Sequence, residues 1–195
     1  MLKSFLFLIA LNIAFFALAQ SNDWNSYASH QESIEHKSMI TLAGWGSANI
    51  LVGAVGWATT EGQTKYFHQM NAAWGAINLG IALPTLLREE SLPESRQSII
   101  QRQYKTEKIL LLNSGLDVAY LSTGFLLKSL AHNNPPSHQQ LKGFGNAILV
   151  QGGFLLIFDL TQYFIHQNHR NKQTNQFWGK LSMSSQGLGL RYTIN

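Results

Sequence analysis

Residues 109–130 read ILLLNSGLDVAYLSTGFLLKSL, an apolar stretch that carries Asn113 and Asp117 on one face. Three further stretches of similar length and pattern occupy residues 39–59, 66–87 and 143–165. A helix of about 20 residues is long enough to cross a hydrocarbon layer of roughly 30 Å. None of the four has the broad charged face with which a water-soluble helix meets solvent. The sequence therefore predicts an all-α fold, a four-span transmembrane helical bundle with a polar interior.

The composition favours the same architecture. Charged residues make up 12% of the chain, against about 25% in a typical soluble domain. Inside the four stretches the charged residues are only Asp117, Asp159 and Lys128, and Lys128 lies near a helix end from which it can reach the interface. The mean hydropathy is close to zero, which keeps a soluble bundle open as the alternative, although much of the polarity falls outside the stretches.

The first 19 residues have the pattern of a secretory signal peptide. Lys3 supplies a positive charge, residues 5–16 are almost wholly apolar, and Ala17-Leu18-Ala19 is a small-x-small cleavage motif. An uncleaved first span is the alternative. We expect an exported, multi-pass membrane protein with these parts: signal peptide 1–19, polar N-terminal segment 20–38, four-helix membrane domain 39–169, and polar, basic C-terminal tail 170–195.

The orientation in the membrane is predicted in two opposite ways. An even number of spans places both ends of the mature chain and the connection 88–108 on one side, together with most of the Lys and Arg. The other side holds only Lys65, Lys128 and Lys142. The positive-inside rule assigns the basic side to the cytoplasm, whereas a cleaved signal peptide assigns it to the exterior. The cleavage motif favours the second orientation, and the sequence does not indicate which membrane.

Each predicted span places its polar residues at alternating spacings of three and four, which aligns them on one helix face. We expect these faces to meet in an intramembrane polar cluster. Its predicted members are Asn49, Asn71, Asn78, Asn113, Asp117, Tyr120, Gln151 and Asp159.

Two interpretations of this cluster stay open. The first is hydrogen bonding that holds the helices together. The second is a proton or cation relay, or a pocket for a small polar ligand, around Asp117 and Asp159. An ionised carboxylate in hydrocarbon costs about 2.5–3.5 kcal/mol, and no span offers a buried Lys or Arg to pair with it. Counting inward from the breaker HNNPPS at 132–137 places Asn113 and Asp159 at similar depth, so we expect those two side chains to approach each other.

Small and aromatic residues predict close helix packing. The sequence WGSAN at 45–49 recurs as WGAIN at 74–78, which hints at an internal repeat but favours a shared use of small residues for packing. The predicted helix-packing residues are Trp45, Gly46, Gly53, Trp74, Gly75, Gly124, Gly152 and Gly153.

Catalytic and cofactor patterns are lacking in the sequence. It has no cysteine, no zinc signature, no phosphate loop and no basic patch interleaved with aromatics for nucleic acid, so we expect no catalytic residue and no cofactor. His36, His166 and His169 fall at one predicted membrane face and are weak candidates for a metal or haem. Residues 188–194 alternate apolar and polar or small residues, which gives the tail strand character.

Part of the chain resembles a known family. Residues 44–82, with YFHQMN at 66–71, are similar to a family of small uncharacterised bacterial membrane proteins with four helices. The motifs GFG at 143–145, QGGF at 151–154 and FDL at 158–160 resemble that family too. The resemblance implies a membrane location and no assigned activity.

Three functions remain open. The leading one is a non-enzymatic membrane scaffold or accessory subunit, with the lipid bilayer as partner and either a second protein or a second copy of the chain. The next is a small transporter or proton or cation conduit that uses Asp117 and Asp159. The third is a haem- or metal-binding redox module, which requires His36 and His166 to face each other.

Overall fold

A computed structural model describes the backbone of residues 2–88, 95–184 and 187–190, and the side chains of residues 24–88 and 95–172. Up to Lys180 the described part of the chain is all-α, as predicted. Its elements are α1 (Leu2–Thr59), α2 (Gly62–Leu86), α3 (Arg96–His132), the short 3₁₀ helix η1 (Pro135–Ser137), α4 (His138–Lys180), β1 (Leu181–Ser184) and β2 (Gly187–Leu190).

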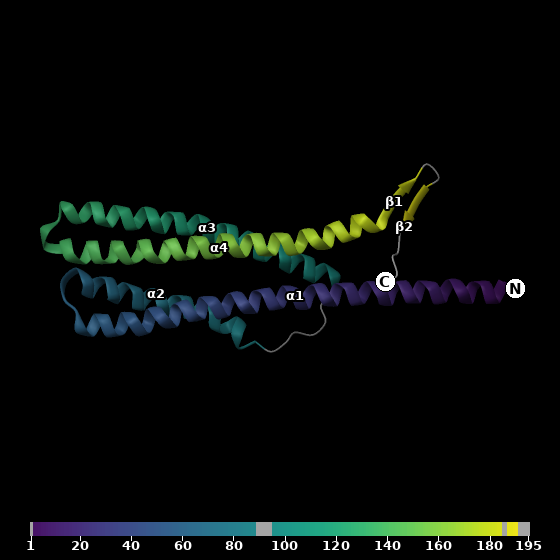
Figure 1. Cartoon of the computed structure of the whole chain (residues 1–195), viewed down its shortest axis with the longest axis horizontal. Helices are drawn as coiled ribbons and strands as arrows, with labels where there is room; N and C mark the ends of the chain where they lie inside the picture. The colour runs from purple at the N-terminus through teal and green to yellow at the C-terminus, as the bar shows by residue number, and fades with distance from the viewer. Residues whose placement is uncertain (1, 89–94, 185–186, 191–195) are drawn as a thin grey trace.

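The helices form two antiparallel hairpins that lie side by side (Figure 1). One hairpin pairs α1 with α2 and the other pairs α3 with α4, while α2 also packs on α4. Both hairpin turns lie at one end of the bundle, and the long N-terminal part of α1 extends from the other end (Figure 1). The bundle therefore has a turn end and an opposite end, called here the terminal end.

Local sequence explains where the helices start and stop. Gly62 begins α2 at a φ of +57°, in the left-handed region that glycine adopts without strain. Ser95 caps α3, because its side chain accepts a hydrogen bond from the Ser98 amide at 3.2 Å. Pro135 opens η1, which links α3 to α4 as the predicted breaker requires. These short links make the paired helices antiparallel neighbours.

Three candidate spans are found among the described residues, one fewer than the sequence predicts. They lie in Trp24–Thr59, Arg96–His132 and Pro135–Lys172. The second predicted span, 66–87, corresponds to α2, which is a single helix of 25 residues but is not among the three. Polar residues on one face, His68, Asn71 and Asn78, interrupt the apolar sequence of this helix.

The structure describes the C-terminal tail and the predicted signal peptide only in part. β1 and β2 pair antiparallel, with Leu181 opposite Leu190, so the first part of the alternating tail lies in β2. Residues 191–195 lie outside the described residues. At the other end α1 continues as helix past Ala19, and the side chains around the predicted cleavage site are not described, so signal cleavage stays a prediction.

The apolar side chains are distributed as expected for a protein in lipid. In the described part of the chain, the buried apolar side chains that cluster together are few: Leu42, Ala82, Leu155 and Phe158. Large apolar side chains instead cover the outer faces of all four helices. They include Leu51, Val52, Val55, Ile77, Ile81, Leu112, Phe125, Ile157 and Phe164. A polar seam inside and an apolar surface outside reverse the usual arrangement of a water-soluble bundle.

Candidate functional site

A single amide, Gln151 of α4, joins four polar side chains in the middle of the bundle. Gln151 Oε1 accepts hydrogen bonds from Trp45 Nε1 at 2.9 Å and from Asn78 Nδ2 at 3.4 Å. Gln151 Nε2 donates to Asn49 Oδ1 at 2.8 Å and to Asn71 Oδ1 at 2.6 Å. The Gln151 side chain is fully buried, at 0% exposure, so these bonds replace every contact that it would make with water.

This group, called here the Gln151 hub, is complete within itself. The amide nitrogens of the two asparagines that accept from Gln151 bond to their own helices. Asn49 Nδ2 donates to Trp45 O, and Asn71 Nδ2 donates to Phe67 O. A glutamine amide has two donors and two acceptor positions, and Gln151 uses all four. The hub therefore fastens α4 to both α1 and α2 and leaves no donor or acceptor of Gln151 for a ligand.

Glycines bring α1 and α2 close enough to form the hub. A Cβ on Gly75 would lie 2.5 Å from Gly46 O and 2.8 Å from Ile50 N, and a Cβ on Gly46 would lie 2.8 Å from Gly75 O. Trp45 stacks on Phe154 with ring centroids 4.0 Å apart, which holds the indole against α4.

Most of the other predicted packing residues lie in close contact with a neighbouring helix, and one does not. Gly53 and Gly124 are also tight positions, Gly152 is less so, and Trp74 packs edge-on against Tyr120. The prediction is wrong for Gly153, where an added Cβ would meet nothing within 4 Å. Adjacent residues on a helix point about 100° apart, so only one of the two neighbouring glycines can face α3.

Two carboxyl groups form a second polar group, between α3 and α4. The side chains of Asp117 and Asp159 are hydrogen bonded to each other. They are 2% and 6% exposed, and Asp117 Oδ2 has no hydrogen-bond partner within the described part of the chain. The carboxyl pair is therefore buried between α3 and α4, apart from the Gln151 hub.

The structure adds a partner for Asp159 that the sequence analysis did not pair with it. Depth counting favours Asn113 as the neighbour of Asp159, and the structure places the Asp117 carboxyl group, one helical turn from Asn113, beside Asp159. Asn113 and Tyr120 are half-buried and belong to neither hydrogen-bonded group. The predicted cluster of eight therefore separates into the Gln151 hub, the carboxyl pair and two residues beside them.

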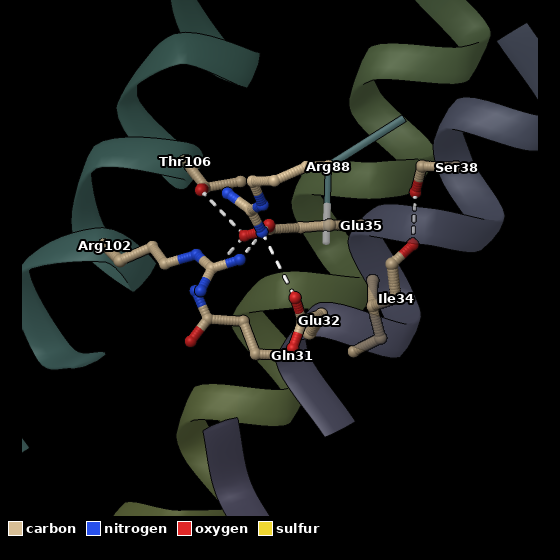
Figure 2. A network of polar contacts seen from close by, with 8 residues as sticks. All are labelled: Gln31, Glu32, Ile34, Glu35, Ser38, Arg88, Arg102 and Thr106. Atoms are coloured by element: carbon tan, nitrogen blue, oxygen red, sulfur yellow. Dashed lines mark hydrogen bonds and ion pairs between the residues drawn. The ribbon is translucent and has the colours of Figure 1, made fainter. Parts of the chain in front are cut away.

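The terminal end carries an ion-pair network that extends beyond the apolar stretches. Figure 2 shows Glu35 of α1 facing Arg102 and Thr106 of α3. Arg102 Nη2 lies 2.8 Å from Glu35 Oε2, and both side chains are mostly buried. Arg88, just after α2, pairs with Glu32 at 3.2 Å in a more exposed position. These two ion pairs join α1 to α3 and to the residue that follows α2 at the terminal end of the bundle.

A second ion pair links α3 to α4 at the same end. Arg170 Nε lies 2.8 Å from Glu107 Oε1. Gln103 Nε2 donates to Glu107 Oε1 and to His166 O, each at 2.9 Å. With Glu35–Arg102, this pair ties α1, α3 and α4 together beyond the point where α2 ends.

His36 and His166 do not form the facing pair that the predicted haem or metal site requires. His36 is exposed, whereas His166 is 2% exposed. His169 stacks on Tyr27 at 4.1 Å and lies beside His30 at 4.9 Å. Groups of three or more metal-ligating side chains are not found among the described residues.

The polar face of α4 continues from the carboxyl pair to the terminal end. Asp159, Gln162, His166 and Arg170 follow one another at spacings of three and four. The side chains of Asp159, Gln162 and Arg170 contact α1 or α3, whereas His166 accepts a hydrogen bond from Gln103 through its backbone oxygen. Gln162 Oε1 accepts from Ser38 Oγ at 2.6 Å. Toward the turn end, the buried Leu155 separates Asp159 from the Gln151 hub. The sequence analysis recognised the spacing but not the partners Ser38, Gln103 and Glu107, which lie on helix extensions outside the apolar stretches.

The comparisons identify the family. Residues 41–160 match a family of unknown function (DUF6992), so the chain belongs to that family. The matched range includes the Gln151 hub and the carboxyl pair and ends before His166. An uncharacterised family was expected from the motifs at 44–82 and 143–160, and the match itself carries neither a bacterial origin nor a membrane assignment. No curated protein and no solved structure matches the chain.

Proposed function

We propose that this member of the family is a non-enzymatic integral membrane protein, a scaffold or accessory subunit whose helices are fastened by the Gln151 hub. The single observation that carries the proposal is the completeness of the hub. A substrate pocket needs polar groups that converge on open space. The donors and acceptors of Gln151 are instead all bonded to four neighbouring side chains. The large apolar side chains on the outer faces then contact lipid or a partner helix.

We further propose that α2 crosses the membrane as a fourth span. It is too polar to qualify by hydropathy alone, but Asn71 and Asn78 are buried against Gln151 rather than turned outward. Its outer face carries exposed Ile77 and Ile81. A helix whose polar groups are satisfied by its neighbours costs little to place in hydrocarbon.

Membrane extraction tests this location. Alkaline carbonate is expected to leave the full chain in the membrane pellet, because the apolar outer faces have no favourable contact with water, and a mild detergent is expected to release it. Quantitative immunoblotting of pellet and supernatant measures both steps. Release of the chain by carbonate alone contradicts the membrane proposal.

One observation favours a second candidate function, a proton carrier or conduit. The carboxyl pair holds an oxygen, Asp117 Oδ2, that is buried without a partner, and a polar column on α4 leads from Asp159 toward the terminal end. Buried groups of this kind in membrane helices commonly belong to proton or ion pathways. In this candidate the pair accepts a proton that enters from the terminal end, and Leu155 closes the path toward the hub.

Infrared difference spectroscopy can detect the proton on the carboxyl pair. Wild-type protein at neutral pH is expected to show the carbonyl band of a buried protonated carboxylic acid, and the double variant Asp117→Asn/Asp159→Asn is expected to lose it. Glu61→Gln, at an exposed position, is the control and should keep the band. An unchanged band in the double variant would show that the pair is not the protonated group.

Proteoliposomes with an internal pH-sensitive dye then separate the two candidates. A scaffold leaves an imposed pH gradient to decay as it does in protein-free vesicles. A conduit speeds the decay, and Asp159→Asn, which keeps the size and hydrogen bonding of the side chain, returns the rate to that of empty vesicles.

A further inference from the structure

The exposed face of α3 contains a shallow groove at the border between its polar and apolar parts. The groove has a volume of about 480 Å³ and is lined by Gln101, Tyr104, Lys105, Lys108, Ile109 and Leu112. These residues follow the spacing of one helix face. The groove lies on the side of α3 that carries none of the contacts described above to α1 through Glu35 or to α4 through Asp117.

The chemistry of the groove changes along its length. One end presents the ammonium groups of Lys105 and Lys108 with the amide of Gln101. The other end presents Ile109 and Leu112, which are 45% and 65% exposed. A ligand that fits both ends has an anionic head and an apolar tail.

The lysines meet no acidic side chain on their own helix. α3 contains two acidic residues, Glu107 and Asp117, and both are buried. Glu107 pairs with Arg170, and Asp117 bonds to Asp159. The outward face of α3 therefore keeps a net positive charge at this level of the bundle.

The level of the groove matches the edge of a bilayer. Residues 96–108 of α3 carry four basic residues, whereas residues 109–127 carry no charged residue other than Asp117. Tyr104, which is 48% exposed, lies at this transition, and aromatic rings of this kind gather at the membrane interface. The Arg170 guanidinium carbon lies 5.3 Å from the centroid of the Tyr104 ring and supports its position.

We propose that this groove binds an anionic phospholipid, with the lipid phosphate on Lys105 and Lys108 and an acyl chain along Ile109 and Leu112. The inference rests on the proposed membrane location of the chain. A phosphate free in solution satisfies the lysines but leaves the apolar end exposed, so the two-part character of the groove favours a lipid. Paired lysines at a membrane surface attract anionic headgroups by charge, without a fixed hydrogen-bond geometry.

Native mass spectrometry of the detergent-purified full chain tests the proposal by titration with phosphatidylglycerol or phosphatidylcholine. The wild type is expected to retain phosphatidylglycerol in preference to phosphatidylcholine. Each lysine near an anionic headgroup contributes about a fivefold gain in binding, so Lys105→Gln/Lys108→Gln should lower the affinity for phosphatidylglycerol by roughly 10- to 25-fold. The affinity for phosphatidylcholine should stay unchanged, and circular dichroism checks that the variant is folded.

The matched control is Lys65→Gln/Lys128→Gln, which removes the same charge from exposed positions toward the turn end. It should bind phosphatidylglycerol as the wild type does. Equal binding of the two lipids by the wild type, or an equal loss in the control, would overturn the lipid site. Competition by millimolar inorganic phosphate would also overturn it, in favour of a soluble anion. These outcomes are separate from carbonate extraction, which alone tests the membrane location.

Discussion

Gly75→Ala is expected to destabilise the bundle by about 2–3 kcal/mol, a cost typical of overpacking a tight interface. The added Cβ would lie 2.5 Å from Gly46 O and 2.8 Å from Ile50 N. Both are backbone atoms of α1, so no side-chain rotation relieves the contact, and the two helices must move apart. That movement also lengthens the hydrogen bonds that Gln151 Nε2 donates to Asn49 and Asn71. Thermal unfolding in a mild detergent, followed by circular dichroism, measures the loss.

Gly80→Ala on the same helix is the matched control. A Cβ at Gly80 would meet nothing within 4 Å, and alanine is a better helix former than glycine by up to about 1 kcal/mol. The control variant should therefore be as stable as the wild type or more stable. If both variants unfold at the same temperature, the close approach of α1 and α2 is not as described here.

Gln151→Leu is expected to cost about 2–4 kcal/mol. The replacement keeps the apolar bulk but leaves Trp45 Nε1, Asn49 Oδ1 and Asn71 Oδ1 without their partner in a buried site. Each unsatisfied buried polar atom costs roughly 1–3 kcal/mol, and the total is reduced because hydrogen bonds between membrane helices average only about 0.6 kcal/mol each. Unfolding in detergent again provides the measurement, together with quenching of tryptophan fluorescence as Trp45 loses its bond.

Gln140→Leu tests whether the loss comes from the hub rather than from the residue type. Gln140 lies on the same helix at an exposed position. Its replacement should change stability by less than about 0.5 kcal/mol, as surface substitutions usually do. A comparable loss in the two variants would contradict the central role of Gln151.

The glycines show why part of the helix packing could be predicted from sequence and part could not. The WG pairs at 45–46 and 74–75 stand on the same face as the asparagines, so the sequence pattern alone marks Gly46 and Gly75. At 152–153 two glycines stand side by side, and sequence gives no reason to choose between them. The choice depends on the rotation of α4 against α3, which turns Gly152 toward Tyr120 and Gly153 away.

The sequence by itself determined the helical class, the apolar stretches and the faces that carry polar residues, because each follows from the periodicity of neighbouring residues along one helix. Only the tertiary structure decided which polar groups meet. Counting from the edges of the apolar stretches did not reveal Asp117 as a partner of Asp159, since the helices extend far beyond those edges and their relative shift is set by packing. Glu35, Gln103 and Glu107 acquired partners for the same reason: hydrogen bonds between helices depend on register and rotation, which no single helix encodes.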